Sequence, residues 1–171
     1  MERYVCNQRG PSPTETSPTP KPSLHLRFHA RIAEAVKQNL RRLENGYWVR
    51  VEQAWNLLST ADDQGLERET ARMIAKELKG FGPKQARNLL QALGLTKYEI
   101  PIDSRVGKRL VQFGCPLPIS RQALAARKGF ELVLDGAQEL CRRCGVYPCM
   151  LDAAMFASFD GDGWDGIKVI W

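Results

Sequence analysis

A short turn with two glycines, Gly80-Phe81-Gly82, joins two helical patterns in the middle of this chain. Glycine adopts backbone conformations that other residues avoid, so such a turn lets the backbone approach a partner closely. The amides at the start of the following helix, which begins near Pro83, offer a ready site for an anion. The turn therefore predicts a hairpin of two helices whose tip can bind a negatively charged group.

Apolar residues recur at three- and four-residue spacing on both sides of this turn, which is typical of amphipathic helices. Before the turn, the spacing predicts helices over residues 26–43, 48–58 and 66–78. After it, proline and glycine signals and the candidate caps Asp103 and Ser120 predict further helices. These cover residues 83–93, 104–112, 120–129, 130–144 and 148–159. Alternation with a period of two is confined to the last five residues, so we expect an all-α chain.

The N-terminal segment differs in composition from the rest of the chain. Five of the ten prolines fall between Pro11 and Pro22. Such a run cannot build a packed core, so residues 1–23 are predicted to form a disordered or polyproline-like tail. Residues 24–171 are predicted to form one helical domain, in line with a chain of 171 residues.

The charge of the chain favours a polyanionic partner, although a solvated basic surface explains it equally well. The formal net charge is +6 and the isoelectric point is about 9.2. No apolar run approaches the roughly 20 residues that cross a membrane. The first 24 residues lack the apolar stretch of a signal peptide. We therefore expect a cytoplasmic, nucleoid-associated protein.

Three of the five cysteines have a spacing that is compatible with a metal site. Cys141, Cys144 and Cys149 form a C-x2-C-x4-C pattern. A closed zinc or iron–sulfur site requires four ligands. The fourth would have to be distant in sequence: Cys115, His25 or His29. We therefore favour free thiols and predict no metal and no other cofactor.

The segment from 78 to 112 matches a known motif, in which two glycines and a lysine follow an apolar residue and precede an apolar helix face. The matching residues are Leu78, Gly80, Phe81, Gly82, Lys84, Ala86, Leu89 and Leu90. With Asp103 downstream, the segment resembles the helix-hairpin-helix-GPD superfamily of DNA glycosylases, which includes endonuclease III and the 8-oxoguanine DNA glycosylases. The interval of 19 residues from Lys84 to Asp103 agrees better with the 8-oxoguanine branch.

The resemblance implies a base-excision repair enzyme with both glycosylase and abasic-site lyase activity. Such an enzyme flips a damaged base out of the duplex and cuts its glycosidic bond. The expected substrate is an oxidised purine, 8-oxoguanine, and the strand is then nicked 3′ to the lesion by β-elimination. Lys84 is the implied nucleophile, which forms a Schiff base with C1′ of the sugar once its amine is neutral. Asp103 is implied to help deprotonate this amine or to stabilise positive charge on the sugar.

The resemblance also implies where damaged or abasic double-stranded DNA binds, with the protein expected as a monomer. Phosphate contacts are expected from Gly80, Phe81, Gly82, Arg105, Lys108 and Arg109. The base pocket is expected to include residues of the last helices and of the C-terminal segment: Asp152, Phe156 and Trp164. In this family the hairpin carbonyls often hold a monovalent cation, and the resemblance allows one here as the single exception to the absence of a cofactor. The cysteine spacing departs from the iron–sulfur pattern of endonuclease III, so no cluster is predicted.

The chain also departs from this family in its N-terminal half. Only about 55 residues and three predicted helices lie between the tail and Leu78, and no clear wedge motif with Gln or Asn is present. We therefore expect a shortened N-terminal half. The leading alternative is a non-catalytic DNA-binding module or an inactive truncated relative, in which Lys84 contacts phosphate and Asp103 only caps a helix. A helical protein-interaction domain is the third possibility.

Overall fold

The computed structural model describes residues 28–117 and 119–158, and all regular structure in these residues is helical. The all-α prediction is therefore confirmed for this part of the chain. The predicted Pro-rich tail, residues 1–23, and the candidate Trp164 lie outside the described residues. The helices are α1 (His29–Arg42), α2 (Trp48–Thr60), α3 (Gln64–Glu77), α4 (Pro83–Ala92), α5 (Ser104–Gln112), α6 (Arg121–Ala125), α7 (Arg127–Cys144) and α8 (Pro148–Ala157).

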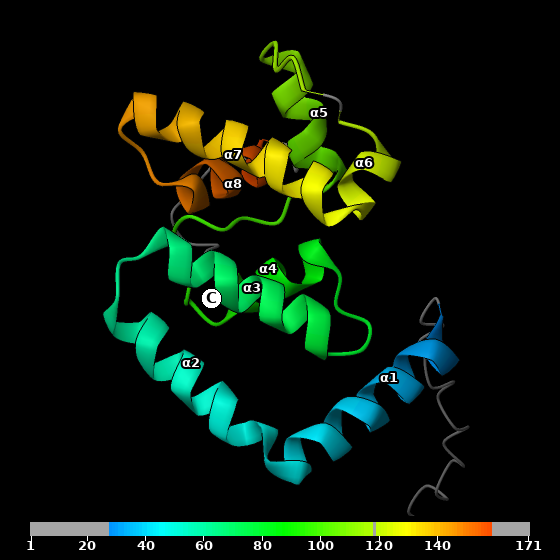
Figure 1. The fold of residues 1–171 in the computed structure, drawn as a ribbon. Coiled ribbons are helices and arrows are strands. Elements are labelled where there is room, and N and C mark those ends of the chain that lie inside the picture. The colour runs from blue at the N-terminus through cyan, green and yellow to red at the C-terminus, as the bar shows by residue number, and fades with distance from the viewer. Residues whose placement is uncertain (1–27, 118, 159–171) are drawn as a thin grey trace, which may run out of the picture.

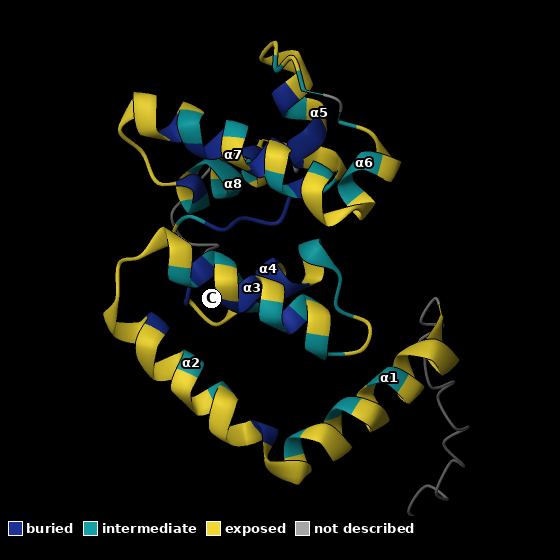
Figure 2. Ribbon diagram, in the orientation of Figure 1, coloured by how far each residue is buried: buried dark blue, intermediate teal, exposed yellow. Residues whose placement is uncertain are grey.

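The helices form two packed groups joined by an extended segment (Figure 1). Helices α3 and α4 lie side by side and form the helical hairpin that the Gly80-Phe81-Gly82 turn predicts. Helices α5 to α8 form the second group, above the hairpin in the figure. Residues 95–102 run between the two groups and are largely buried (Figure 2). Helices α1 and α2 form a V below the hairpin, with a bend over Leu43–Tyr47.

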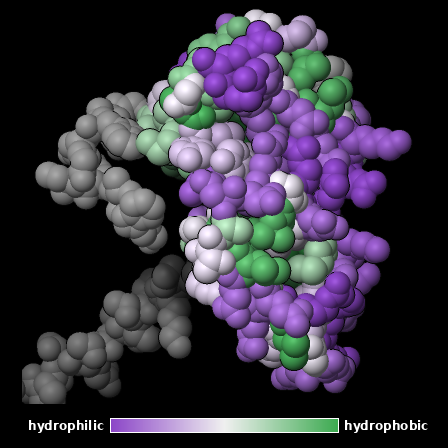
Figure 3. Space-filling model, turned by 60° about the vertical axis from the view of Figure 1, so that its left-hand side comes forward, coloured by the Kyte–Doolittle hydropathy of each residue, from purple (hydrophilic) through white to green (hydrophobic). Residues whose placement is uncertain are grey.

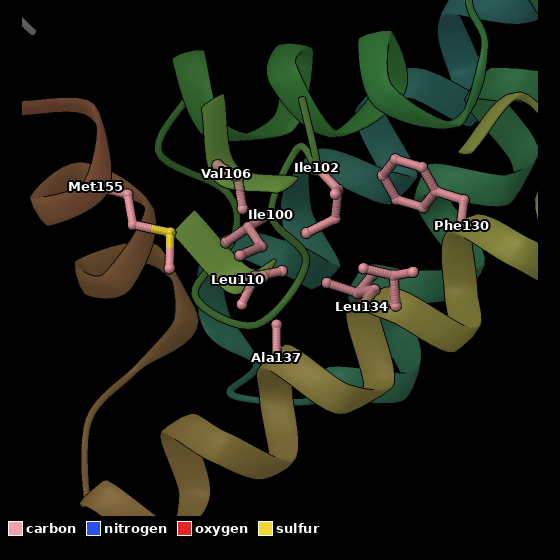
Figure 4. Packing of buried hydrophobic residues seen from close by; sticks show 9 residues of the cluster. Ile100, Ile102, Val106, Leu110, Phe130, Leu134, Ala137 and Met155 are labelled. Atoms are coloured by element: carbon pink, nitrogen blue, oxygen red, sulfur yellow. The ribbon is translucent and has the colours of Figure 1, made fainter. Parts of the chain in front are cut away.

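The main core lies within the second group, beside the extended segment. Apolar side chains of α7 point toward two isoleucines of this segment and toward α5, and Met155 of α8 lies on the other side (Figure 4). The core residues are Ile100, Ile102, Val106, Leu110, Phe130, Val133, Leu134, Ala137 and Met155, each at most 3% exposed. This packing fixes the segment that leads into Asp103.

A smaller core holds the hairpin together. Buried residues from α2, α3, α4 and the segment after α4 pack there: Leu58, Ala71, Ile74, Ala86, Leu90 and Leu95. Phe81 of the turn is half-buried against this cluster. The apolar pattern of the hairpin sequence is therefore used for packing α3 against α4.

The apolar faces that the spacing predicts on the first two helices are largely exposed. Helix α1 has no buried residue, and Ile32, Val36 and Leu40 on its apolar face are exposed. Trp48 and Trp55 of α2 lie at helical spacing, a pattern that favours core positions over base-stacking ones, but their side chains are 50% and 46% exposed. In the described residues, the V of α1 and α2 meets the hairpin mainly at its tip and along α3. Other hydrophobic side chains likewise reach the surface in patches between hydrophilic ones (Figure 3).

The helix boundaries agree with the sequence signals except between α6 and α7. Asp103 and Ser120 cap α5 and α6 as predicted. Helix α6 ends at Ala125, however, and Gly129 lies inside α7 instead of ending α6. A side chain at Gly129 would collide with the Ala123 carbonyl, so glycine is required there by the close approach of α6.

None of the helices in residues 28–117 and 119–158 is both long enough and apolar enough to cross a membrane.

Candidate functional site

The hairpin turn has the local geometry that its two glycines require. Gly80 has a φ of +82°, in the left-handed region that L side chains rarely adopt. Gly82 is the N-cap of α4, and Pro83 occupies the first turn of that helix. Lys84 follows Pro83 directly, so its side chain starts at the N-terminal end of α4, which is the positive end of the helix dipole.

One side of this turn is covered by α1, a contact that the sequence did not reveal. The side-chain amide of Asn39 donates to the carbonyl of Lys79 at 2.9 Å and accepts from the Lys79 amide at 2.7 Å. A Cβ at Gly80 would lie 3.4 Å from the Cβ of Ala35. The turn is thus held in place by α1, while Gly80 itself remains exposed.

The monovalent cation that the resemblance allows would be held by backbone carbonyls of the hairpin turn. The carbonyls of Leu78, Lys79 and Gly82 already accept hydrogen bonds, from Phe81, Asn39 and Ala86. A carbonyl oxygen has two lone pairs, so these hydrogen bonds neither exclude nor establish a cation at the turn. No step proposed below uses one.

Lys84 and Asp103 line the same open pocket, which has a volume of about 990 Å³. The start of α4 provides Lys84 and Gln85, and the start of α5 provides Asp103 and Ser104. Helix α6 and Ile119 form the far wall. The two residues that the sequence singled out are thus brought together by tertiary packing, although 19 positions separate them. Both are half-buried, which leaves them accessible from solvent.

Asp103 uses one carboxylate oxygen to cap α5. Its Oδ1 accepts hydrogen bonds from the amides of Arg105 at 2.8 Å and Val106 at 3.0 Å. The described residues give Oδ2 no hydrogen-bond partner. The capping role weighed as an alternative is therefore present, and it leaves the second oxygen uncommitted beside the pocket.

Positive charge surrounds the Lys84 amine in this pocket. Lys108 of α5 and Arg121 of α6 also line it, so the described lining residues contribute three cations and one carboxylate, that of Asp103. A pocket with this balance suits a group that carries phosphates.

The other two predicted DNA contacts of α5 interact with α8. Arg109 donates from Nε to the hydroxyl of Ser158 at 3.1 Å and from Nη2 to its carbonyl at 3.2 Å. The guanidinium of Arg105 lies 4.8 Å from the centre of the Phe156 ring. Lys108, by contrast, is exposed on the pocket wall.

Asp152, predicted in the base pocket, belongs to the same electrostatic environment as Lys84 and Asp103. It is half-buried, and Gln91 of α4 donates a hydrogen bond to its Oδ2 at 2.8 Å. Burial raises the pKa of Asp152, and the nearby charge of Asp103 raises it further. The Gln91 hydrogen bond and the charge of Lys84 oppose this shift. Asp152 does not itself line the pocket described above.

This coupling predicts how the Asp152 carboxyl will titrate. Asp103→Asn should lower the pKa of Asp152 because it removes a neighbouring negative charge. Lys84→Gln should raise it because it removes a neighbouring positive charge. Carbon-13 NMR titration of the side-chain carboxyls measures both shifts.

Glu139 of α7 is the matched reference in the same spectra. Its pKa is about 2 because Arg142 and Arg143 hold its carboxylate. It should titrate identically in the wild type and in both variants. An Asp152 pKa that is the same in all three proteins would contradict the coupling.

Phe156 is placed on the surface of α8 and does not line the pocket that holds Lys84. Its side chain is 54% exposed and packs against Arg105. Of the three residues predicted to form the base pocket, the structure therefore brings Asp152 alone close to the Lys84–Asp103 pair within its described part.

A buried ionic network ties the hairpin to the segment that carries Asp103. Glu99 is fully buried, and its carboxylate accepts from Nε of Arg87 at 2.7 Å and from Nε of Arg68 at 2.8 Å. Arg87 of α4 also donates to the Pro83 carbonyl at 2.9 Å and lies over the Phe130 ring at 4.7 Å. Because Arg87 follows Lys84 by three residues and Glu99 precedes Asp103 by four, this pair fixes one candidate residue relative to the other.

A second buried carboxylate, Glu67 of α3, orders the start of the same segment. It accepts hydrogen bonds from the backbone amides of Lys97, Tyr98 and Glu99 at 2.8–2.9 Å, and from the hydroxyl of Thr96. These bonds satisfy amides that the extended segment could not pair by itself. The segment is therefore fixed at both its start and its end.

The described cysteines do not form a metal site. In residues 28–117 and 119–158, no three potential ligands among His, Cys, Asp and Glu gather closely enough to hold a metal ion. Cys141 is buried, and burial raises the pKa of its thiol to about 11. Cys144 is exposed and Cys149 is half-buried.

The sequence missed several residues of the site. Arg121 and Gln85 line the pocket, and Arg87 and Glu99 position it. Arg87 carried a usable signal, because a charged residue lies next to Ala86 and three residues before Leu90 on the buried face of α4.

Comparison with known proteins finds no matching family model, curated relative or solved structure.

Proposed function

We propose that this protein is a DNA glycosylase with abasic-site lyase activity, which removes an oxidised base such as 8-oxoguanine from double-stranded DNA. The observation that carries the proposal is the shared pocket of Lys84 and Asp103. Lysine and aspartate at this spacing, behind a turn with two glycines, are the residues that the motif of residues 78–112 implies. The excess of cations in the pocket supports a polyanionic substrate.

The proposed reaction begins with attack by the neutral amine of Lys84 on C1′ of the damaged nucleotide. The glycosidic bond breaks as the new bond forms, and the base leaves with the bonding electrons and takes up a proton. The free Oδ2 of Asp103 stabilises positive charge on the sugar and can accept a proton from the attacking nitrogen. The bond between C1′ and O4′ then breaks as the nitrogen lone pair forms the C=N bond, O4′ leaves with the bonding electrons and takes the proton held by Asp103, and a Schiff base joins Nζ to C1′.

The second half of the proposed reaction cuts the strand. Loss of a proton from C2′ converts the Schiff base into an enamine, and the bond between C3′ and its oxygen breaks. The 3′ phosphate leaves with the bonding electrons. Water then hydrolyses the imine and regenerates the Lys84 amine. Lys108 and Arg121 are suited to hold the phosphates on either side of the reacting sugar.

The test is release of base and strand cleavage from a duplex that carries one 8-oxoguanine. The proposal predicts both products, with cleavage 3′ to the lesion. The leading alternative is a DNA-binding module, and the two hydrogen bonds that Asp103 makes as a helix cap favour it. That alternative predicts salt-sensitive DNA binding without either product.

Asp103→Asn separates the chemical role of Asp103 from its structural role. Asparagine caps helices about as well as aspartate, so α5 should keep its start. The negative charge is lost, and base excision should slow by about 10²- to 10⁴-fold. Single-turnover assays of base release measure the rate, and circular dichroism checks the fold. An Asn variant as fast as the wild type would remove Asp103 from the proposed chemistry.

A further inference from the structure

An open hollow of about 540 Å³ lies at the bend between α1 and α2, away from the Lys84 pocket. Residues from the end of α1, from the bend and from the start of α2 line it. Figure 1 shows where these segments lie in the fold. We call it the arginine hollow; its lining residues are Gln38, Arg41, Arg42, Asn45, Gly46, Tyr47 and Arg50. Gly46 has no neighbour near its Cβ position, which keeps this part of the hollow open.

The charge of the arginine hollow is strongly positive. Among the described residues, three guanidinium groups and no carboxylate line it. Glu77, the last residue of α3, contacts two of them, at 2.8 Å from Arg42 and 3.1 Å from Arg50. Three positive charges against one negative charge leave an excess of two. Arg41 has no hydrogen-bond or ion-pair partner among the described residues.

Two of the guanidinium groups are held in place before any ligand arrives. Arg42 and Arg50 both lie over the ring of Tyr47, at 5.0 Å and 5.8 Å from its centre. Their side chains remain 48% and 55% exposed. A guanidinium has five N–H donors, more than Glu77 uses. Because the groups are already ordered by Glu77 and Tyr47, binding an anion costs little side-chain entropy.

Tyr47 itself provides a second, independent observation. It is only 7% exposed, and its hydroxyl makes no hydrogen bond of good geometry in the described part of the chain, although burial and the neighbouring Glu77 carboxylate raise its pKa. Buried hydroxyl groups are normally well paired, so this hydroxyl, with Glu77 and the arginines beside it, fits a site that a ligand or its water completes.

The arginine hollow adjoins the tip of the hairpin. Glu77 is followed directly by the turn, and Asn39 of α1 bonds the turn residue Lys79 on both its amide and its carbonyl. We propose that the arginine hollow is a phosphate-binding site and that its occupant is the backbone of a DNA duplex running past the hairpin tip. The phosphate chemistry follows from the arginines, and the identification of the source as DNA rests on the proposed function.

The test measures binding of an undamaged, fluorescently labelled duplex by anisotropy over a range of KCl concentrations. The variants are Arg41→Gln, whose side chain supports no packing, and the double variant Arg41→Gln/Arg50→Gln. Each lost phosphate contact should lower the slope of log affinity against log salt by about 0.9. Affinity should fall by up to about fivefold for the single variant, as for an exposed ion pair. Single-turnover base excision at saturating DNA should not change.

Arg31→Gln is the matched control. It removes the same charge from α1 but lies outside the arginine hollow, and it should leave the salt slope unchanged. If Arg31→Gln and Arg41→Gln lost the same amount of DNA affinity and salt dependence, the effect would come from the overall positive charge of the protein. That result would contradict a specific phosphate site in the arginine hollow. A hollow that binds inorganic phosphate in calorimetry, while its variants bind duplex like the wild type, would overturn DNA as the occupant.

The outcomes also separate this site from the proposed function. Weaker duplex binding by the arginine variants, in a protein that releases no base and forms no adduct, would keep the site and reject the glycosylase. Normal excision with unchanged binding by all arginine variants would keep the glycosylase and reject the site. No binding of any duplex by the wild type would reject both.

Discussion

Lys84→Gln should abolish covalent trapping of the protein on DNA that contains an abasic site. Sodium borohydride reduces a Schiff base between an amine and C1′ to a stable secondary amine. Because the proposed reaction uses the Lys84 amine to attack C1′, adduct should fall from readily detected to background in this variant. Duplex binding should persist, because Gly80, Gly82 and the other cations remain. Denaturing gel electrophoresis of the adduct measures the effect.

Lys108→Gln is the control for this prediction. Lys108 lines the same pocket and carries the same charge, but it lies on α5 away from the start of α4. Its variant should still form the adduct, with weaker binding at higher salt. If adduct survived in Lys84→Gln and disappeared in Lys108→Gln, the nucleophile would have to be reassigned.

Glu99→Ala should strongly destabilise the fold. It would leave the guanidinium of Arg87, whose side chain is 2% exposed, without its carboxylate in the core. Breaking one half of a buried ion pair costs about 3–5 kcal/mol. Arg68 would also lose its contact with Glu99, while it keeps Asp135. Urea unfolding followed by circular dichroism measures the free energy of unfolding.

The matched control is Glu139→Gln, which also removes a carboxylate that pairs with two arginines. Glu139 pairs with Arg142 and Arg143 on the surface of α7. Solvent screens this interaction, so the unfolding midpoint should stay near that of the wild type. Similar midpoints for Glu99→Ala and Glu139→Gln would contradict the structural role of the buried network.

Local signals in the sequence were sufficient for the helices and for most of their ends, the boundary between α6 and α7 excepted. Pro83 and the glycine after α4 frame that helix, and Asp103 and Ser120 cap the helices that follow them, because these effects act within a few residues. The Lys84–Asp103 pairing was also accessible from the sequence, through the motif that surrounds it. The structure places Lys84 and Asp103 in one pocket, which is consistent with this pairing.

Tertiary contacts account for what the sequence did not reveal. Arg87 and Glu99 are 12 residues apart and are joined only when the extended segment packs against α4. Asn39 reaches the hairpin turn across 40 positions. Spacing also predicted an apolar face on α1, but spacing does not say whether another element covers that face. The exposed apolar side chains of α1 and α2 show that an apolar face in the sequence does not by itself predict burial.

The most direct test of the proposed chemistry is borohydride trapping of the wild-type protein on a duplex with one 8-oxoguanine, followed by mass spectrometry of the cross-linked peptide. A glycosylase that uses Lys84 as its nucleophile should give an adduct that requires both borohydride and the lesion, with the modified residue mapped to Lys84. A protein that binds this duplex but yields no adduct, or an adduct on a different lysine, would contradict it.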